Sequence, residues 1–461
     1  MESTLDRTIT TEALRLKVSG NVHLPSDESY DAARASWNLT LDHRPAIVVQ
    51  ARTEDDVVEA IRFADANDLP IAVHNTGHGA PRVSNGGVLI SMGAMNGVRI
   101  DREAKTASIQ GGAVWADVIP RAVEAGLVPV SGSSPGVGVV GYTLGGGFGI
   151  LSRKYGLGVD NVLSFRIVTP GGEAQTVYPN EDLYWAVLGG GGSYGVVTEI
   201  TIRLHPHGSL FAGSVMFDAS LSDTIYPTFV EWTKDLPEEV SAAITMLTYP
   251  PVPFIPEFLH GRSMLTVSAA VLADATEAER LLAPIRSLPG AEYDAFRPIS
   301  YTESAQVFND PVEPLPASGR GVLLKDLDDV AVSTLLRSIG APAESPNMMI
   351  QIRHLGGAMG KPGLYANAVS DRRKAKYLAY FLAVPIGPVT LEAAKAHAEA
   401  AFESIEPWVL SRGPLNWLGE GNVEKQDIRS VFDDDGFAKL LAVKQAVDPK
   451  NRFRFAGVGV E

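Results

Sequence analysis

The sequence predicts an α+β fold in two regions of different texture. Only residues 46–74 have the strand–helix–strand order of a parallel βαβ unit. The β-like runs that follow, at 87–91, 98–101 and 107–111, have no helix-length segment between them, which argues against a doubly wound sheet. From about His205 onward, longer apolar strands alternate with helical stretches and proline-rich joints. We therefore expect a second domain in that part of the chain.

The βαβ unit carries clear local signals. The apolar run at 46–51 predicts a buried strand. Thr53, with Asp56 three residues later, has the pattern of a capping box and predicts a helix with an apolar stripe. Residues 70–74 predict the next strand, and a further helix is expected over 114–125.

The second region predicts a separate sheet with helices on one face. Its expected strands are 210–217, 241–248, 264–271, 348–354 and 377–384, and its expected helices lie near 275–287, 326–339 and 390–404. After Trp408 we expect a loop, one helix over 423–446 and a short tail.

Composition limits the function. The formal net charge of −15 argues against nucleic acid or an anionic membrane as a partner, because both need a basic surface. The absence of cysteine excludes disulfides, thiolate metal sites and cysteine nucleophiles, and we predict no metal site. No apolar run reaches the length of a membrane span, and the N-terminus lacks the apolar core of a signal peptide. We expect a cytoplasmic protein.

Glycine is concentrated in the first region. Dense segments occur at 131–149 and 189–195, and a third glycine loop contains His78. Gly190, Gly192 and Gly195 match the dinucleotide fingerprint, but a helix-like segment precedes them and a strand follows, which is the reverse of the required order. The glycines either serve tight turns or let backbone approach a large ligand closely.

His78 is the first candidate for a cofactor contact. A histidine beside small residues in a tight loop can place a ring nitrogen against a cofactor while backbone N–H groups face a phosphate. The alternative is that His78 is an ordinary turn residue.

A series of short motifs then matches a known family in order along most of the chain. The motifs are Trp37-Asn38 with Arg44-Pro45, Gly77-His78, 137–147, 153–156 with Asp160-Asn161, 182–186, 189–198, 355–358, 442–444 and 448–453. In this order they resemble the berberine-bridge-enzyme-like flavoproteins, a branch of the vanillyl-alcohol-oxidase and p-cresol-methylhydroxylase type FAD superfamily. Residues 205–410 match poorly, as expected for a variable substrate domain.

The resemblance implies a two-lobed FAD-binding domain of the p-cresol-methylhydroxylase type, formed by residues 1–204 and 416–461. A substrate domain, an antiparallel sheet covered by helices on one face, is inserted at 205–415. His78 would be bonded to the flavin 8α-methyl group, and the loop 74–80 would hold the pyrophosphate. Residues 134–147 would line the isoalloxazine, and Val197 would approach the adenine. The implied cofactor contacts are His74, Asn75, Thr76, Gly77, His78, Gly79, Ala80, Ser134, Val137, Gly138, Gly141, Tyr142, Gly145, Gly146, Gly147, Val197, Asn416 and Asn451.

The sequence departs from the family pattern at three places. Ser134 stands where many members have a cysteine that forms a second flavin bond, so a single covalent link is expected. His74, Asn75 and Thr76 replace the usual arginine and glycines of the pyrophosphate loop. Trp417 follows Asn416 where relatives often have tyrosine or phenylalanine, which removes a tyrosinate base.

The catalytic residues are less defined. Oxidation of a C–H bond by flavin needs a base for the O–H or N–H proton, and the candidates are Tyr155, His354 and Glu420. Each has a structural alternative: Tyr155 packs, His354 lies on the outer face of its strand, and Glu420 is a solvated loop acid. Val137 occupies the position that gates oxygen in similar enzymes, where valine goes with oxidase behaviour.

The expected function is an FAD-linked oxidase of an alcohol or hydroxylated small molecule, such as a sugar or secondary metabolite. Molecular oxygen would be the acceptor and hydrogen peroxide a product. The alternatives are a flavin dehydrogenase, an oxygenating enzyme of secondary metabolism, and a flavin-binding protein without turnover.

Overall fold

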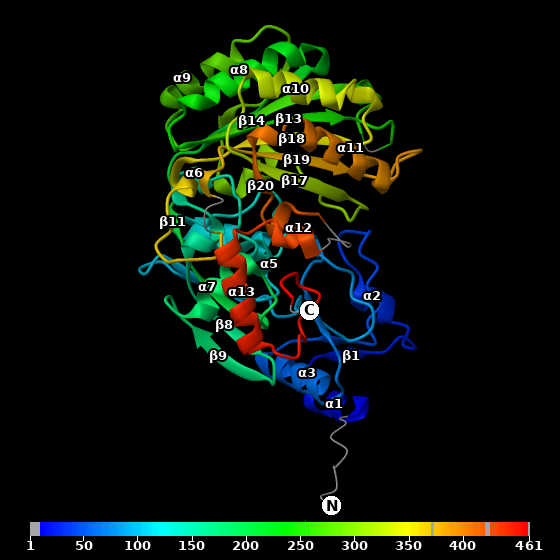
Figure 1. Cartoon of the computed structure of the whole chain (residues 1–461). Coiled ribbons are helices and arrows are strands. Elements are labelled where there is room, and N and C mark those ends of the chain that lie inside the picture. Colours follow the sequence, from blue (N-terminus) through cyan, green and yellow to red (C-terminus); the bar gives the residue numbers. More distant parts are fainter. Residues whose placement is uncertain (1–9, 254, 370–372, 420–424, 460–461) are drawn as a thin grey trace, which may run out of the picture.

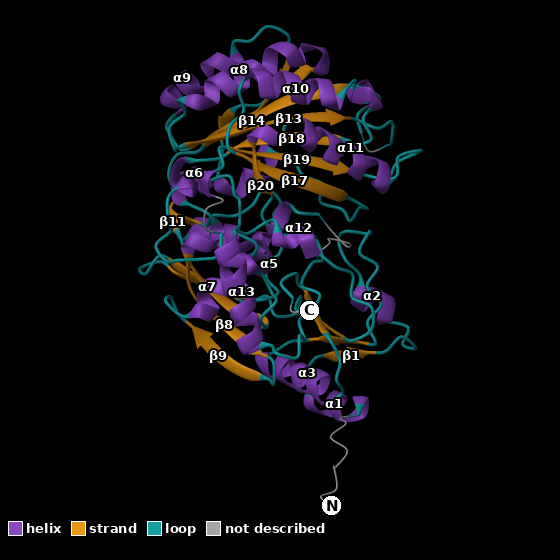
Figure 2. Cartoon of the chain, in the orientation of Figure 1, coloured by secondary structure: helices purple, strands orange, loops and turns teal. Residues whose placement is uncertain are grey.

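The computed structural model describes residues 10–253, 255–369, 373–419 and 425–459. Two lobes lie one above the other in Figure 1, with a large sheet in the upper lobe and two smaller sheets in the lower one. The helices of the upper lobe gather above its sheet, and the loops of both lobes meet below it (Figure 2). The fold is therefore α+β with antiparallel sheets, as predicted.

The four-stranded sheet of the lower lobe has the order β1–β2–β4–β3. Its strands are β1 (Asn21–His23), β2 (Ile47–Gln50), β3 (Ile71–His74) and β4 (Val88–Ser91). The helix α3 (Glu54–Ala66) begins at the predicted capping box of Thr53 and Asp56. The βαβ unit is confirmed, but β4 lies between β2 and β3 and pairs parallel with both. The short helices α1 (Thr11–Lys17) and α2 (Tyr30–Arg34) precede it.

The second sheet of the lower lobe is antiparallel, with the order β5–β6–β10–β8–β9. The helix α4 (Trp115–Glu124) follows β6 and matches the predicted segment. The helix α7 (Asp182–Gly190) precedes β10, which confirms the element order that excluded a dinucleotide fingerprint. The strands are β5 (Val98–Asp101), β6 (Thr106–Gln110), β8 (Val162–Thr169), β9 (Glu173–Val177) and β10 (Val196–Arg203). A small pair is formed by β7 (Leu127–Val128) and β11 (His205–Pro206).

The upper lobe is built on a nine-stranded antiparallel sheet with the order β15–β12–β14–β13–β18–β19–β17–β20, and β16 pairs with β12. All five predicted strands of this region are present, whereas β15, β16, β17 and β20 were not predicted; β15 and β16 both pair with β12. The strands are β12 (Phe211–Asp218), β13 (Val240–Thr248), β14 (Ser263–Val271), β15 (Ala291–Asp294), β16 (Arg297–Pro298), β17 (Ser318–Leu324), β18 (Met349–His354), β19 (Tyr377–Ala383) and β20 (Val409–Arg412).

Helices cover one face of this sheet, and the hydrophobic core of the upper lobe lies between them and the sheet. The three predicted helices are present, together with α8, which was not predicted. Alternate strand residues such as Ile350 and Ile352 are buried against these helices, as the two-residue period of a strand requires. The helices are α8 (Ser222–Lys234), α9 (Ala275–Arg286), α10 (Asp329–Ile339) and α11 (Leu391–Ser404). The opposite face of the sheet is turned toward the lower lobe (Figure 1).

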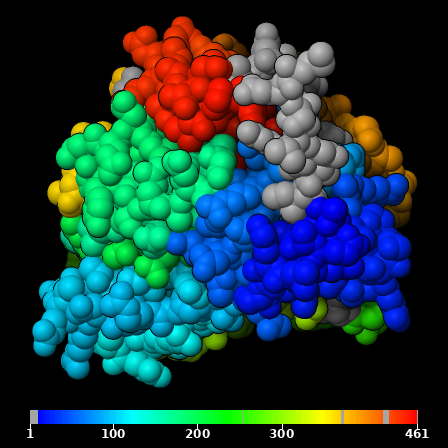
Figure 3. Space-filling model, turned by 90° about the horizontal axis from the view of Figure 1, so that it is seen from below, coloured from blue at the N-terminus to red at the C-terminus, as the bar shows by residue number. Residues whose placement is uncertain are grey.

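The C-terminal segment returns to the lower lobe. The single helix predicted over 423–446 is wrong: the structure has α12 (Lys425–Arg429) and α13 (Asp434–Val447), because Asp433 caps a new helix. The tail then contacts β3 of the lower lobe, where the Ile71 N–H donates to the carbonyl of Arg452 at 2.8 Å. Seen from below, the C-terminal segment lies against the surface around residue 180 (Figure 3), where Lys439 pairs with Asp182 at 3.0 Å.

No helix in the described part of the chain is both long and apolar enough to cross a bilayer.

Candidate functional site

The loop after β3 holds His78 in a defined orientation. Its imidazole stacks on the indole of Trp37, with ring centroids 4.4 Å apart and planes 11° apart. Its Nδ1 lies 2.6 Å from the Thr76 hydroxyl oxygen. Burial lowers the pKa of His78 to about 4, so the ring is neutral at physiological pH. A neutral, oriented imidazole is able to act as a nucleophile or hydrogen-bond partner.

Gly77 is required by the geometry of this loop. Its φ of +68° lies in the left-handed region, and a Cβ there would come within 2.5 Å of Ser36 Cβ. The next glycine differs, because a Cβ at Gly79 would meet no atom within 4 Å. The loop is thus packed tightly on one side of His78 and open on the other.

The segment 134–147 forms the wall beside this loop. Gly136 and Gly141 are exposed, and a Cβ at Gly136 would lie 3.9 Å from His78 Nε2. A Cβ at Gly141 would again meet open space. Val137 is half-buried next to Gly136, and Ser134 is half-buried at the start of the segment. The chain then enters the short helix α5 (Val139–Leu144). Gly79 and Gly136 therefore leave accessible backbone beside His78, and Gly141 leaves more of it further along the segment.

Two asparagines tie the predicted cofactor segments together. A Cβ at Gly138 would lie 2.9 Å from Asn75 Nδ2, and this amide donates to the carbonyl of Ala113 at 3.3 Å. The Asn416 amide donates to the carbonyl of Tyr142 at 3.2 Å. The structure thus brings the segments around residues 75, 138, 142 and 416 together.

Gly145 and its neighbours allow close backbone packing at the end of the segment. A Cβ at Gly145 would come within 2.4 Å of Asn416 Oδ1. Gly146 and Gly147 have φ of +121° and +75°, which only glycine adopts readily. In the His78 loop, Ala80 follows Gly79 and is half-buried.

Other predicted contacts lie deeper in the protein. The His74 ring is buried edge-on against the ring of His43, and burial lowers the pKa of His74 to about 4. Val197 is buried in β10. Asn451 has φ of +50° in the turn that brings the tail back to β3. The side chain of His74 is therefore part of the core beneath the loop.

Comparison with known proteins agrees with this architecture. The family model described as an FAD binding domain matches residues 45–178. The chain is 27% identical over 460 residues to (R)-6-hydroxynicotine oxidase of Paenarthrobacter nicotinovorans, covering 96% of this chain and 97% of that protein. Solved structures with a similar fold include berberine-bridge-enzyme-like 1 of Physcomitrella patens (TM-score 0.85, 20% identity, 98% and 100% coverage). A chitooligosaccharide oxidase is also similar (TM-score 0.83, 20% identity, 96% and 97% coverage).

The chain is an FAD-linked oxidoreductase with the berberine-bridge-enzyme-like fold. The resemblance drawn from the motifs is confirmed. The residues of this flavoprotein also fit FAD. Exposed glycines leave room for a large planar ligand. The buried Nδ1 of His74 and the buried hydroxyl of Ser36 have no hydrogen-bond partner among the described residues, so they are available to a ligand. FAD would be held by the loop 74–80 and the segment 134–147.

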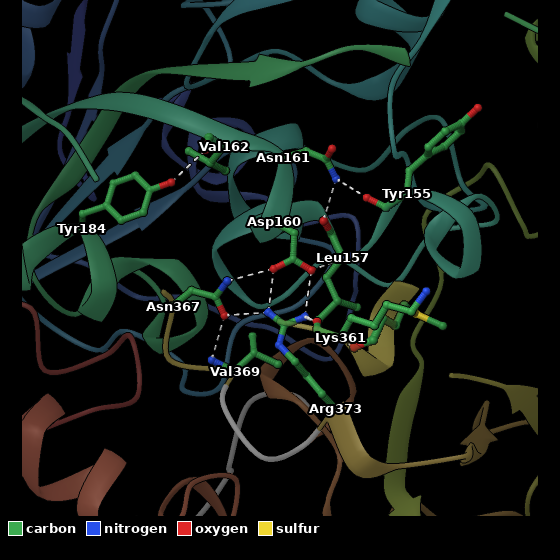
Figure 4. A network of polar contacts seen from close by, with 11 residues as sticks. Tyr155, Leu157, Asp160, Asn161, Val162, Tyr184, Lys361, Asn367, Val369 and Arg373 are labelled. Carbon is green, nitrogen blue, oxygen red and sulfur yellow. Dashed lines mark hydrogen bonds and ion pairs between the residues drawn. The ribbon is translucent and has the colours of Figure 1, made fainter. Parts of the chain in front are cut away.

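The flavoprotein does not bring its three proposed bases together at these segments. Tyr155 is the last residue of α6 (Ser152–Tyr155), and its ring stacks on that of His205 with the ring centroids 3.9 Å apart. In the network of Figure 4, Tyr155 takes part through its backbone carbonyl, which accepts from the Asn161 amide. Burial raises the pKa of Tyr155, which disfavours a tyrosinate. Its packing alternative is therefore the better interpretation. Glu420 lies outside the described residues.

His354 lies on the face of β18 that the helices cover, beside Arg153 of α6. It is opposite Tyr377, which packs in the core on the helix-covered face. Its Nε2 accepts from the Arg153 guanidinium at 3.1 Å, and burial followed by the charge of Arg153 lowers the pKa of His354 to about 3. These contacts favour the alternative that His354 has a structural role in its strand.

Sequence reasoning missed Arg353, which the fold places next to the segments predicted to line the flavin. Arg353, the neighbour of His354, projects from the other face of β18 and lies 4.6 Å from the centre of the Trp417 ring. The alternation of side chains along the strand separates Arg353 from His354, but the sequence does not say which face of the strand is turned toward the lower lobe.

Proposed function

We propose that this flavoprotein is an oxidase with covalently bound FAD, acting on an alcohol or another hydroxylated small molecule such as a sugar or secondary metabolite. The neutral, desolvated imidazole of His78 is the observation that carries the proposal. It is oriented by Trp37 and Thr76 and lies beside exposed glycine backbone. Electrons from the substrate would pass to molecular oxygen and give hydrogen peroxide.

The proposed link is a single bond between a ring nitrogen of His78 and the flavin 8α carbon. Forming it replaces one methyl hydrogen, releases one proton and leaves two electrons on the flavin, which oxygen removes as hydrogen peroxide. The absence of cysteine from the chain permits no second thioether bond. Thr76 holds Nδ1, so Nε2, which faces Gly136, is the nitrogen we assign to the bond.

Bound FAD would accept the hydride equivalent from the substrate carbon, while the protein supplies orientation and electrostatics. The glycines of 134–147 allow backbone to approach the ring closely. The uncovered face of the upper sheet, in the proposed substrate domain 205–415, lies above this segment and would set specificity. The proposed FAD-binding portions are 1–204 and 416–461.

The proposal is tested by denaturing the purified protein with acid. Flavin should remain in the pellet with the wild-type protein and move to the supernatant with His78→Ala. His23→Ala serves as the matched control, because His23 lies on β1 and bonds only to Ser29 and Gln50. Flavin that leaves the wild-type protein on acid treatment would contradict the covalent link. Anaerobic mixing with sugars, alcohols and phenols, followed by the flavin absorbance, would identify turnover.

A further inference from the structure

Arg353 projects from the face of the upper sheet that has no helices. Side chains alternate across β18, and its neighbours Ile350 and Ile352 are buried in the core under the helices. Gln351 and Arg353 therefore lie on the opposite face, which is turned toward the FAD-binding portion (Figure 1).

Aromatic rings remove water from the Arg353 guanidinium. Its central carbon lies 4.5 Å from the ring centre of Phe308 and 4.6 Å from that of Trp417. Burial lowers the pKa of Arg353, with Asp310 acting in the opposite direction. The ordinary pKa of arginine is so high that the group stays charged. A cation is thus held in an environment of low polarity, where its electrostatic interactions are strong.

This cation is not neutralised by a neighbouring carboxylate. No acidic group among the described residues lies within salt-bridge distance of Arg353, and its single hydrogen bond runs from Nε to the Gln351 side-chain oxygen. Asp310 instead accepts a hydrogen bond from the Ser133 hydroxyl at 2.5 Å. Nη1 and Nη2, the two ends of the guanidinium fork, have no acceptor in the described part of the chain.

The contacts around Arg353 connect it to the segment predicted to line the flavin. Trp417 follows Asn416, whose amide donates to the carbonyl of Tyr142. Arg353 also lies close enough to Tyr142 to lower the pKa of its buried hydroxyl, against a larger increase caused by burial. The free end of the guanidinium is therefore at the junction of the uncovered sheet face and the 134–147 segment.

We propose that Arg353 binds a carboxylate of the substrate, so that the substrate class is small hydroxylated carboxylic acids. The Nη1 and Nη2 donors match the two oxygens of a carboxylate, and the aromatic surroundings make the pairing strong. No salt bridge in the described residues satisfies this charge, and Asp310 acts on it only from a greater distance. The inference rests on the proposed function, because it names the substrate class of the same site.

The test compares benzoate with benzamide, which has nearly the same shape but no charge. Binding to the FAD-loaded protein is measured by calorimetry and by the perturbation of the flavin absorption band. Benzoate should bind more tightly than benzamide, and Arg353→Met should weaken benzoate by about tenfold or more while leaving benzamide unchanged. Arg353→Lys should restore part of the difference. The matched control is Arg337→Met, which removes the same charge from the exposed side of α10.

The inference is overturned if benzoate binds no better than benzamide, or if Arg353→Met weakens both probes equally. It is also overturned if Arg353→Met changes the flavin midpoint potential and leaves benzoate binding intact, because the guanidinium would then act on the flavin. Failure of the proposed function has a different signature: acid-released flavin, or flavin that no hydroxylated compound reduces. Both of these results are measured without the benzoate comparison and do not depend on it.

Discussion

At the scale of a single residue, the surroundings of His78 suit the covalent flavin link that we propose. Desolvation keeps the ring neutral, stacking on Trp37 orients its plane, and the Thr76 hydroxyl is hydrogen-bonded to Nδ1. When Nδ1 donates its proton to the Thr76 oxygen, the lone pair of the neutral ring is on Nε2. This is the arrangement that a nitrogen nucleophile needs.

Thr76→Val tests this assignment, because it keeps the shape of the side chain and removes the hydroxyl. We expect covalent attachment to become slower, since both tautomers of His78 are then populated. The covalent fraction is measured by acid precipitation at intervals after apoprotein is mixed with FAD. Unchanged attachment kinetics would show that the hydroxyl does not select the reacting nitrogen.

Val137 is half-buried beside the exposed Gly136, in the segment that would line the flavin. Leucine adds one methylene, which crowds a space suited to valine. We expect Val137→Leu to slow reoxidation of the reduced flavin by oxygen and to leave anaerobic reduction almost unchanged. Stopped-flow traces of the two half-reactions measure both rates. Equal reoxidation rates in wild type and variant would leave Val137 as a packing residue.

At the scale of elements, polar contacts join the segment around Asn367 and Arg373 to Asp160 of the lower lobe. Asp160, in the single turn 158–161, accepts from Arg373 at 2.6 and 2.8 Å and from the Asn367 amide at 2.9 Å (Figure 4). Arg153 of α6 donates only to backbone carbonyls and to His354. The motif Asp160-Asn161 therefore has a structural role.

Asp160→Asn removes the negative charge and leaves the Arg373 guanidinium buried without its counterion. The two side chains are 5% and 10% exposed. We expect the free energy of unfolding to fall by about 3 kcal/mol, as for other broken buried ion pairs. Urea unfolding measures the loss. The control Glu277→Gln breaks an exposed pair with Arg280 on α9 and should cost less than about 1 kcal/mol. Equal effects of the two variants would contradict the role of the Asp160 network.

At the scale of the whole molecule, buried histidines make stability depend on pH. Burial lowers the pKa of His74 and His205 to about 4 and that of His354 to about 3. Between these values and the ordinary 6.5, the unfolded chain binds protons that the folded protein does not. The free energy of unfolding should therefore fall as the pH falls from about 6.5 toward 4.

His205→Gln should make this dependence less steep. Removing one such histidine takes away up to about 1.4 kcal/mol of stability change per pH unit within that window. Urea unfolding at a series of pH values measures the slope. If the variant and the wild type have the same slope, His205 titrates alike in the folded and unfolded states.

Much of the fold followed from local patterns. The capping box at Thr53 and Asp56 began α3 as predicted, and the apolar runs of the second region became strands. The long helix predicted near the C-terminus failed because Asp433 caps a separate helix. The strands β17 and β20 were missed because β17 begins with two glycines within four residues and β20 is only four residues long, so neither shows an extended apolar run.

The sequence alone determined the FAD-binding family, through motifs that depend on glycine geometry and occur in a fixed order. It also made His78 the candidate for the flavin link, because the histidine lies in a tight glycine loop, and that role stays a prediction. Only the tertiary structure places Arg353 on the uncovered face of the upper sheet and His354 on the helix-covered face. Adjacent residues of a strand point to opposite faces, and which face meets the lower lobe depends on how the whole sheet packs. The neutral state of His78 was likewise decided by tertiary burial, which no short segment encodes.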